Sequence, residues 1–389
     1  MQVEQSVQRV FRQTGGDRYI WLVVVVLFLV SMLAVYSSTG TLAFRVQGGN
    51  MEYYMLRQLL MILTGLGLMY VTHRIPFPFF SRIAQLLLLL SVPLLVITLL
   101  FGQEINDARR WLTIPVINIS FQTSDLARLA LILYVARMLV VNKDQLHDFR
   151  NGFLPLVLPV LLVCGLIAPS NFSTASILLV TCMTLMFVGR VPVLYLGSVL
   201  LLAVLLLGFL LLLDHLTPFS TRVDTWSSRL ESFTERSEEP YQVQQAKMAI
   251  AHGGLLGVGP GNSIQRNFLP SPYSDFIYAI IVEEYGLIGG VMLILLYLFF
   301  LLRCIQIARR STGFFGAYLV IGLSVAIVGQ ALINMAVVVH LLPTTGVTLP
   351  LISMGGTSIL FTSLAVGIIL SVSRATEQNH EPANSESGD

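Results

Sequence analysis

Long apolar runs separated by short polar stretches dominate this sequence. About ten of them approach the roughly 20 residues that a helix needs to cross a hydrocarbon core. The clearest are 20–37, 55–71, 83–101, 193–213, 276–302, 314–339 and 357–372, and the shorter or interrupted ones are 126–141, 152–168 and 174–188. Short strands with period-two alternation are not evident. The pattern therefore predicts a helical bundle rather than a β-barrel.

Composition places this bundle in a membrane. Of the 389 residues, 55% are hydrophobic and only 11% are charged, values far from those of a soluble domain. We therefore expect an all-α polytopic membrane protein with about ten transmembrane helices and a large extracytoplasmic loop between the seventh and eighth.

Basic residues orient the predicted bundle, because Lys and Arg in short loops stay on the cytoplasmic side. Placing both termini inside leaves only Arg45, Arg109 and Arg110 in short outer loops. The expected organisation is a cytoplasmic N-terminus (1–19), helices one to seven (20–213), an extracytoplasmic loop (214–275), helices eight to ten (276–373) and a disordered cytoplasmic tail (374–389).

Three stretches outside the predicted spans have patterns of their own. Val243, Ala246 and Ile250 recur at helical spacing, which indicates an interfacial helix or, equally, a solvated helix that shields the bundle. The glycines of GGLLGVGPGNS could turn amides toward a phosphate, but both nucleotide-binding fingerprints fail, so a plain turn is favoured. The irregular HLLPTTGVTLPLISMGGTS lies between two apolar runs, and we expect it to dip into a cavity.

Several charges lie where a membrane makes them costly. Asp125 and Arg128 are three residues apart at the start of an apolar run, which predicts an ion pair on one helical face, either structural or functional. Arg109, Arg110 and Trp111 come just before them on the same side, where interfacial anchoring is the alternative to a role in a site.

Three carboxylates mark the stretch SPYSDFIYAIIVEEYGLIGG. Asp275 could merely cap the helix that follows. Glu283 and Glu284 come more than two turns later, so they belong inside the protein or in a hydrated cavity, and spacing leaves their role open. The chain's cysteines and histidines are scattered, so neither a disulfide framework nor a metal site is indicated.

Five stretches together resemble the RodA/FtsW/SpoVE family, also called SEDS proteins. They are ARRW, FQTSDLAR, YQVQQAKMAIAHGGLLGVGPGNS, LPSPYSDFIYAIIVEEYGLIGG and LPTTGVTLPLISMGGTS, in the family's order over nearly the whole chain. TTGVTLPLIS and GPGNSIQRNFLP look more like the division member, FtsW, than the elongation member, RodA.

The resemblance implies a ten-helix inner-membrane glycosyltransferase that polymerises lipid II and releases undecaprenyl diphosphate. It implies a septal location, a class B penicillin-binding transpeptidase and other division proteins as partners, and no nucleic acid. Asp275 matches the family's catalytic Asp, and Glu283 and Glu284 match its paired acids. Asp125 and Arg128 stand where the family commonly has Glu and Lys, and Asn171 stands where it has an acid.

The implied chemistry suits these residue types. An inverting displacement at an anomeric carbon needs one base on the acceptor hydroxyl and charge stabilisation on the diphosphate that leaves. Asp275 is the candidate base. The candidates for binding the substrate are Arg109, Arg110, Trp111, Asp125, Arg128 and Lys247, with the cations on the diphosphate. Whether a divalent cation such as Mg²⁺ shares this work stays open.

Two other functions compete with polymerisation. A lipid II flippase or transporter would also have intramembrane charges and broken helices, although no inverted repeat is evident and the polar residues concentrate on one side. A non-catalytic scaffold of the division machinery would leave Asp275 as a helix cap only.

Overall fold

The computed structural model describes residues 15–40, 42, 51–105, 108–114, 119–216, 233 and 240–380. Each predicted apolar run coincides with one α-helix. These helices are α2 (Arg18–Ser38), α4 (Met51–Arg74), α5 (Pro78–Phe101), α6 (Thr123–Val141), α7 (Leu154–Ile167), α8 (Phe172–Val188), α9 (Val193–Leu216), α12 (Ile277–Arg310), α13 (Phe314–Val338) and α14 (Thr357–His380).

The described helices are those of a multi-pass membrane protein. Seven spans are long and apolar enough to cross a bilayer, one of them being α7 together with the π-helical turn Phe149–Phe153 before it, and α8 and part of α9 are shorter apolar helices. The helix α6 differs because Asp125, Arg128 and Arg137 interrupt its apolar sequence. Outward-facing leucines such as Leu89 (73% exposed) and Leu194 (81% exposed) leave an apolar surface that suits lipid rather than water.

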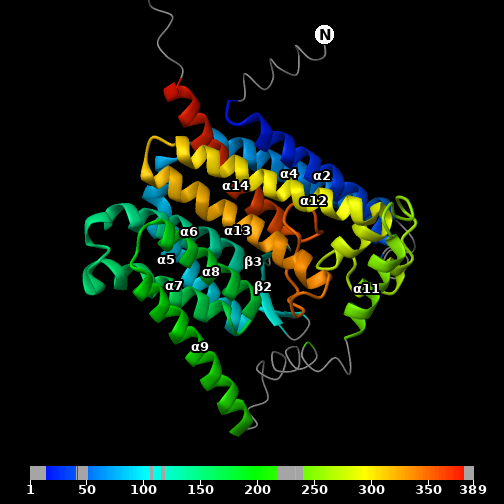
Figure 1. The fold of residues 1–389 in the computed structure, drawn as a ribbon, viewed down its shortest axis with the longest axis horizontal. Coiled ribbons are helices and arrows are strands. Elements are labelled where there is room, and N and C mark those ends of the chain that lie inside the picture. The colour runs from blue at the N-terminus through cyan, green and yellow to red at the C-terminus, as the bar shows by residue number, and fades with distance from the viewer. Residues whose placement is uncertain are drawn as a thin grey trace, which may run out of the picture.

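The helix α13 forms the centre of the bundle. It packs against α12 and α14 on one side and against α6 and α8 on the other, and most of its residues are buried. Figure 1 also shows α9 extending away from the other helices. A polar side chain that α13 presents can therefore contact several elements at once.

A small sheet corrects the all-α prediction. Strands β1 (Gln103–Ile105), β2 (Ala108–Ile114) and β3 (Ile119–Gln122) form an antiparallel three-stranded sheet between α5 and α6. In it Leu112 pairs with Phe121 and Thr113 with Ser120, so a period-two pattern does exist. It escaped notice because the strands are short and the sheet depends on packing against α5, α6 and α14.

The helix α12 is interrupted at Gly286, whose φ of 70° and ψ of −175° are not helical. The glycine-rich turn docks into this break: the amides of Val258 and Gly259 donate to the carbonyls of Glu283 and Glu284, both at 3.0 Å. A Cβ atom on Gly257 would lie 2.1 Å from the Glu284 carbonyl oxygen, so only glycine allows this approach. These glycines therefore serve close packing, in keeping with the favoured turn.

Helix α11 (Tyr241–Gly253) lies within the predicted outer loop. It packs on α12, with Val243 and Ala246 buried. The pattern thus correctly identified the helix, and its apolar face contacts protein. Most of the rest of the predicted loop, 217–232 and 234–239, lies outside the described residues.

The two described ends of the chain meet at one end of the bundle. The amide of Gly16 donates to Glu377 at 2.9 Å, and that of Asp17 donates to Ser373 at 2.9 Å. The prediction that a disordered tail begins at 374 is therefore wrong for 374–380, which continue α14, because these contacts hold the last turns. Residues 381–389 lie outside the described residues.

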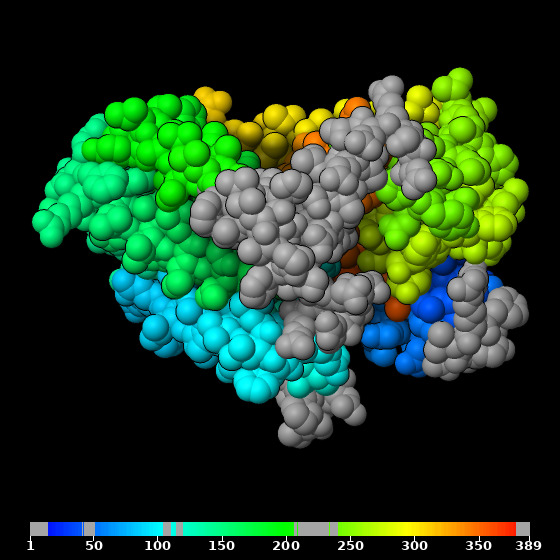
Figure 2. All heavy atoms as spheres, turned by 90° about the horizontal axis from the view of Figure 1, so that it is seen from below, coloured from blue at the N-terminus to red at the C-terminus, as the bar shows by residue number. Residues whose placement is uncertain are grey.

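Polar and irregular elements gather at the opposite end, where Figure 1 shows the sheet, α11 and the link between α13 and α14. Figure 2 shows another view of the molecule, with α7–α9 in green and α11 with its following turn in yellow-green at opposite sides of one face. Within the bundle, the cysteines Cys164, Cys182 and Cys304 are buried and unbridged.

Candidate active site

A polar cavity of about 440 Å³ lies at the sheet end of the bundle. It is walled by β2, β3, α6, α8, α11, α13, α14, the stretch before α12 and the link between α13 and α14. Its charged and amide-bearing lining residues are Arg110, Gln122, Asp125, Arg128, Asn171, Gln242, Asp275, Gln330 and Asn334. A cavity with this many polar groups in a membrane protein is a strong candidate for a functional site.

Two guanidinium groups form the cationic part of the wall. Arg110, on β2, donates from Nε to the carbonyl of Ser170 at 2.8 Å. Arg128, on α6, donates from Nη1 to Gln330, and its Nη2 lies 3.7 Å from Asp125 Oδ1. The predicted ion pair is thus confirmed. Asp125 is only 5% exposed, and its Oδ2 has no hydrogen-bond partner within the described part of the chain.

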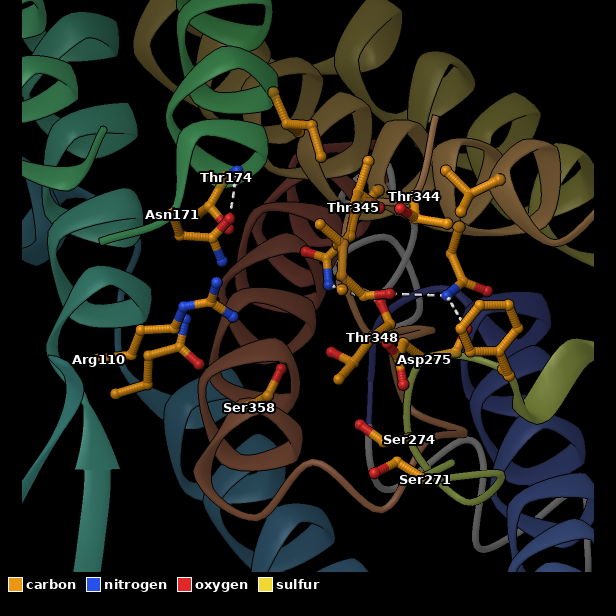
Figure 3. A pocket seen from close by; sticks show the side chains of 18 of the residues that line it. Arg110, Asn171, Thr174, Ser271, Ser274, Asp275, Thr344, Thr345, Thr348 and Ser358 are labelled. Carbon is orange, nitrogen blue, oxygen red and sulfur yellow. Dashed lines mark hydrogen bonds between the residues drawn. The ribbon is translucent and has the colours of Figure 1, made fainter. Parts of the chain in front are cut away.

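Asp275 supplies a second carboxylate to the cavity and is half-buried. It is not the N-cap of α12, since that position belongs to Phe276, which forms no side-chain cap. Figure 3 shows Asp275 with Ser271 and Ser274 across the cavity from Arg110.

Gly346 lies close to both the acid and the cation. A Cβ atom at this position would lie 3.9 Å from Asp275 Oδ2 and 4.0 Å from Arg110 Nη1. Its φ of 63° also lies in the left-handed region that favours glycine. The irregular link that contains Gly346 lines the cavity with residues 344–348, as its sequence predicted.

The structure brings together most, but not all, of the predicted site residues. Asp275, Arg110, Trp111, Asp125 and Arg128 all line the cavity. Lys247 is not among the lining residues, whereas Gln242 of the same helix is. At 3.6 residues per turn, five positions place the two on different faces of α11. The side chain of Arg109 lies outside the described residues.

The sequence analysis did not identify several of the lining residues as site candidates. Gln330 and Asn334 interrupt the apolar run 314–339 at a spacing of four, which is a detectable signal because a buried amide is costly without partners. Asn171, noted only as a departure from the family, caps α8 by accepting from the amide of Thr174 at 3.2 Å. The hydroxyls of Thr344, Thr345, Thr348 and Ser358 carried no signal.

Glu283 and Glu284 do not line the cavity. Glu283 accepts hydrogen bonds from Ser263 and from the amide of Ile264 (3.1 Å), and its Oε1 lies 2.9 Å from His252 Nδ1. Glu284 accepts from Ser37 of α2. The two acids thus connect residues 263–264 and α2 to the broken part of α12.

The described residues contain no group of three His, Cys, Asp or Glu side chains arranged to hold a metal ion. The two carboxylates of the cavity are Asp125 and Asp275, and Asp125 already lies beside Arg128. These side chains alone do not form a coordination shell for a divalent cation.

The fold and cavity define a class: polytopic helical membrane proteins with an acid and cations facing one polar cavity at the end of the bundle. The family model FTSW_RODA_SPOVE, described as "Cell cycle protein", matches residues 17–378. The chain belongs to this family, as its motifs indicated.

Known proteins resemble the chain over nearly its full length. A relative from Coxiella burnetii named "Probable peptidoglycan glycosyltransferase FtsW" is 35% identical over 92% of this chain and 96% of its own. A solved structure described as "Structural coordination of polymerization and crosslinking by a peptidoglycan synthase complex" has a TM-score of 0.75 at 24% identity, covering 93% of this chain and 99% of that one. The crystal structure of the Thermus thermophilus rod shape determining protein RodA has a TM-score of 0.68 at 23% identity, covering 93% and 97%. The two structures establish the fold.

Proposed function

We propose that this chain is a peptidoglycan glycosyltransferase that polymerises lipid II into glycan strands during septal cell-wall synthesis. The observation that carries the proposal is that Asp275 and Arg110 both lie beside Gly346 in a polar cavity of a membrane bundle. Relatives of this chain that are named FtsW glycosyltransferases support the reaction class and the division role.

The cavity contains the groups that an inverting transfer requires. The acceptor hydroxyl attacks the anomeric carbon of the donor, the bond from that carbon to the diphosphate breaks, and Asp275 takes the proton of the hydroxyl. The undecaprenyl diphosphate leaves as an anion without a general acid. A β-linked glycan results from an α-linked donor.

Arg110 and Arg128 hold the diphosphate in this proposal. Both line the cavity, and the protein already holds both, Arg110 through Ser170 and Arg128 through Gln330 and Asp125, which fixes the guanidinium groups before substrate arrives. Preorganised cations in a water-poor site stabilise developing negative charge more than they would in water. Trp111 and Asp125 belong to the same wall. Arg109, adjacent to Arg110, is a further candidate, whereas the position of Lys247 argues against its role.

The proposed topology places the cavity on the outer side of the inner membrane, with ten crossings and both termini in the cytoplasm. The basic-residue bias of the short loops supports it, and the meeting of the two described chain ends agrees with an even number of crossings. Cysteine labelling of intact cells should find 214–274 outside and 303–311 inside. The reverse pattern would overturn the topology and the lipid II assignment.

The solved synthase complex supports a transpeptidase partner, which we take to be a class B penicillin-binding protein. The test is therefore made on the purified chain with that partner, whose transpeptidase is blocked by a β-lactam. Lipid II in detergent should be converted into glycan strands that gel electrophoresis resolves. Transport of lipid II across vesicles without polymer would favour a flippase, and neither activity would favour a scaffold; both results contradict the proposal.

A further inference from the structure

Two amide side chains interrupt the apolar centre of the bundle. Gln330 and Asn334 lie one turn apart on α13, are only 5% and 1% exposed, and both line the cavity. A buried amide is destabilising unless its polar atoms find partners. Their contacts therefore indicate what they hold in place.

Asn334 joins two segments that lie outside the helices. Its Nδ2 donates to the carbonyl of Asp275 at 2.8 Å and to that of Val347 at 2.6 Å. Both acceptors are carbonyl oxygens, so only the NH₂ group of the amide can bond them. This requirement fixes the orientation of the amide. Asn334 thus attaches the backbone of Asp275 to the central helix.

Gln330 makes the corresponding connection to the cationic wall. Its Nε2 donates to the carbonyl of Thr348 at 2.9 Å, and its Oε1 accepts from Arg128 Nη1. The same side chain thus contacts the irregular link and the guanidinium that pairs with Asp125. A neutral amide can orient this guanidinium without neutralising it.

The irregular link and the stretch before α12 are held together at further points. Ser353 donates from Oγ to the carbonyl of Ser274 at 2.6 Å, and the amide of Met354 donates to that of Tyr273 at 2.9 Å. Asp275 and residues 347–354 therefore form one unit. Asn334 and Gln330 anchor this unit to the bundle at successive turns of one helix.

We propose that Asn334 and Gln330 are positioning residues for glycan polymerisation, Asn334 acting through Asp275 and Gln330 through Arg128. The inference rests on the proposed function, because it assigns Asp275 to proton transfer and Arg128 to the diphosphate. Neither amide takes part in bond making. Together they set the relative placement of the acid and one of the cations across the cavity.

Their different contacts predict different kinetic defects. A base displaced by about 1 Å costs on the order of 100-fold in rate, so loss of the Asn334 donor should lower kcat and leave KM for lipid II within about twofold. Loss of the Gln330 contact releases Nη1 of Arg128, so the guanidinium is oriented less well. This should weaken a charge-assisted hydrogen bond from Arg128 to substrate and raise KM roughly tenfold.

The experiment compares Asn334→Asp, Asn334→Leu, Gln330→Met and wild type, each purified with the transpeptidase partner. Aspartate preserves shape but presents oxygen to both carbonyls, and leucine fills similar space without a donor. Ser324→Ala is the matched control, because Ser324 is also a buried polar residue of α13, its hydroxyl bonds within the helix to Ile321, and it is absent from the cavity wall. Initial polymerisation rates against lipid II concentration give kcat and KM, and melting temperature gives the folded state.

The expected result is a selective loss of kcat in both Asn334 variants and a selective rise of KM in Gln330→Met, with normal kinetics for Ser324→Ala. Wild-type kcat in both Asn334 variants would overturn the inference while wild-type polymerisation upholds the proposed function. Unfolding of both Asn334 variants, or a kcat loss no larger than the loss of folded protein, would make the residue structural and also overturn it. Absence of glycan strands from the wild type would instead refute the proposed function.

Discussion

Two acidic sites, one within α12 and one just before its first residue, have opposite surroundings. Glu283 and Glu284 are 0% and 1% exposed, and Glu283 accepts from a hydroxyl and backbone amides. Asp275 is half-buried, faces a 440 Å³ cavity and lies across Gly346 from Arg110. A carboxylate that is fully buried and bonded by its own chain is structural, whereas a partly exposed one that lines a polar cavity opposite a cation is positioned for chemistry.

The largest effect on the polymerisation rate is expected at Asp275, to which the comparison assigns the chemistry. Asp275→Asn should lower the polymerisation rate by roughly 10²–10⁴-fold, the range that a general base contributes. The side chain keeps its size and Asn334 still bonds the backbone, so melting temperature and membrane insertion should stay unchanged. Wild-type turnover by a well-folded Asp275→Asn protein would refute the general-base role.

The ion pair of Asp125 and Arg128 combines features of both acidic sites, because it is buried like Glu283 and lines the cavity like Asp275. Asp125→Ala or Arg128→Ala alone should cost about 3–5 kcal/mol of stability, since each leaves a buried charge uncompensated. The double variant should lose less than the sum and should fold without polymerising. A thermal double-mutant cycle checks this, and additive losses would mean that the two side chains are not coupled. An active double variant would make the pair purely structural.

Substitution of Glu283 should have the opposite effect to substitution of Asp275, lowering stability rather than turnover. Glu283→Ala leaves the amide of Ile264 and the hydroxyl of Ser263 without this acceptor, at roughly 1–3 kcal/mol per buried group. Melting temperature should therefore fall, while turnover per folded molecule stays within about threefold of wild type, a margin well below a general base's contribution. Glu283→Gln, which keeps one acceptor oxygen, should be milder. A hundredfold loss of turnover at unchanged stability would erase the distinction between the two regions.

The smallest expected effect concerns which cations of the cavity bind the substrate. Arg110→Gln should raise KM for lipid II about tenfold, the effect of one lost hydrogen bond to a charged group. Lys247→Gln should leave it nearly unchanged, because Lys247 is not part of the cavity wall. Titrating lipid II into matched preparations compares them, and equal KM increases would return Lys247 to the site.

The sequence was sufficient for the helices, because their long apolar runs are a property of consecutive residues. The same holds for the ion pair of Asp125 and Arg128, which one helical turn brings together. The sheet was missed since its short strands depend on contacts with α5, α6 and α14. The helix α14 exceeded its predicted end because Gly16 and Asp17, at the other end of the chain, bind its last turns.

The cavity itself was only partly predictable. Asp275, Arg110 and Arg128 belong to motifs that resemble the family, and so they could be proposed individually. Their meeting depends on Gln330, Asn334 and Gly346, which lie 55–71 residues beyond Asp275 and reach the same cavity only in the folded bundle. Lys247 does not line the cavity although Gln242 of the same helix does, because the sequence did not reveal which face of α11 the cavity uses.

Chemical rescue tests the central claim most directly, because it asks what Asp275 supplies beyond its place in the fold. Asp275→Ala and Glu283→Ala, each with the transpeptidase partner and lipid II, are assayed for glycan strands at increasing formate concentration, with acetate and chloride as controls. If Asp275 contributes only a carboxylate to the cavity, formate restores turnover to Asp275→Ala in a saturable manner and leaves Glu283→Ala unchanged. An equal response of both variants, or full activity of Asp275→Ala without formate, would contradict the account.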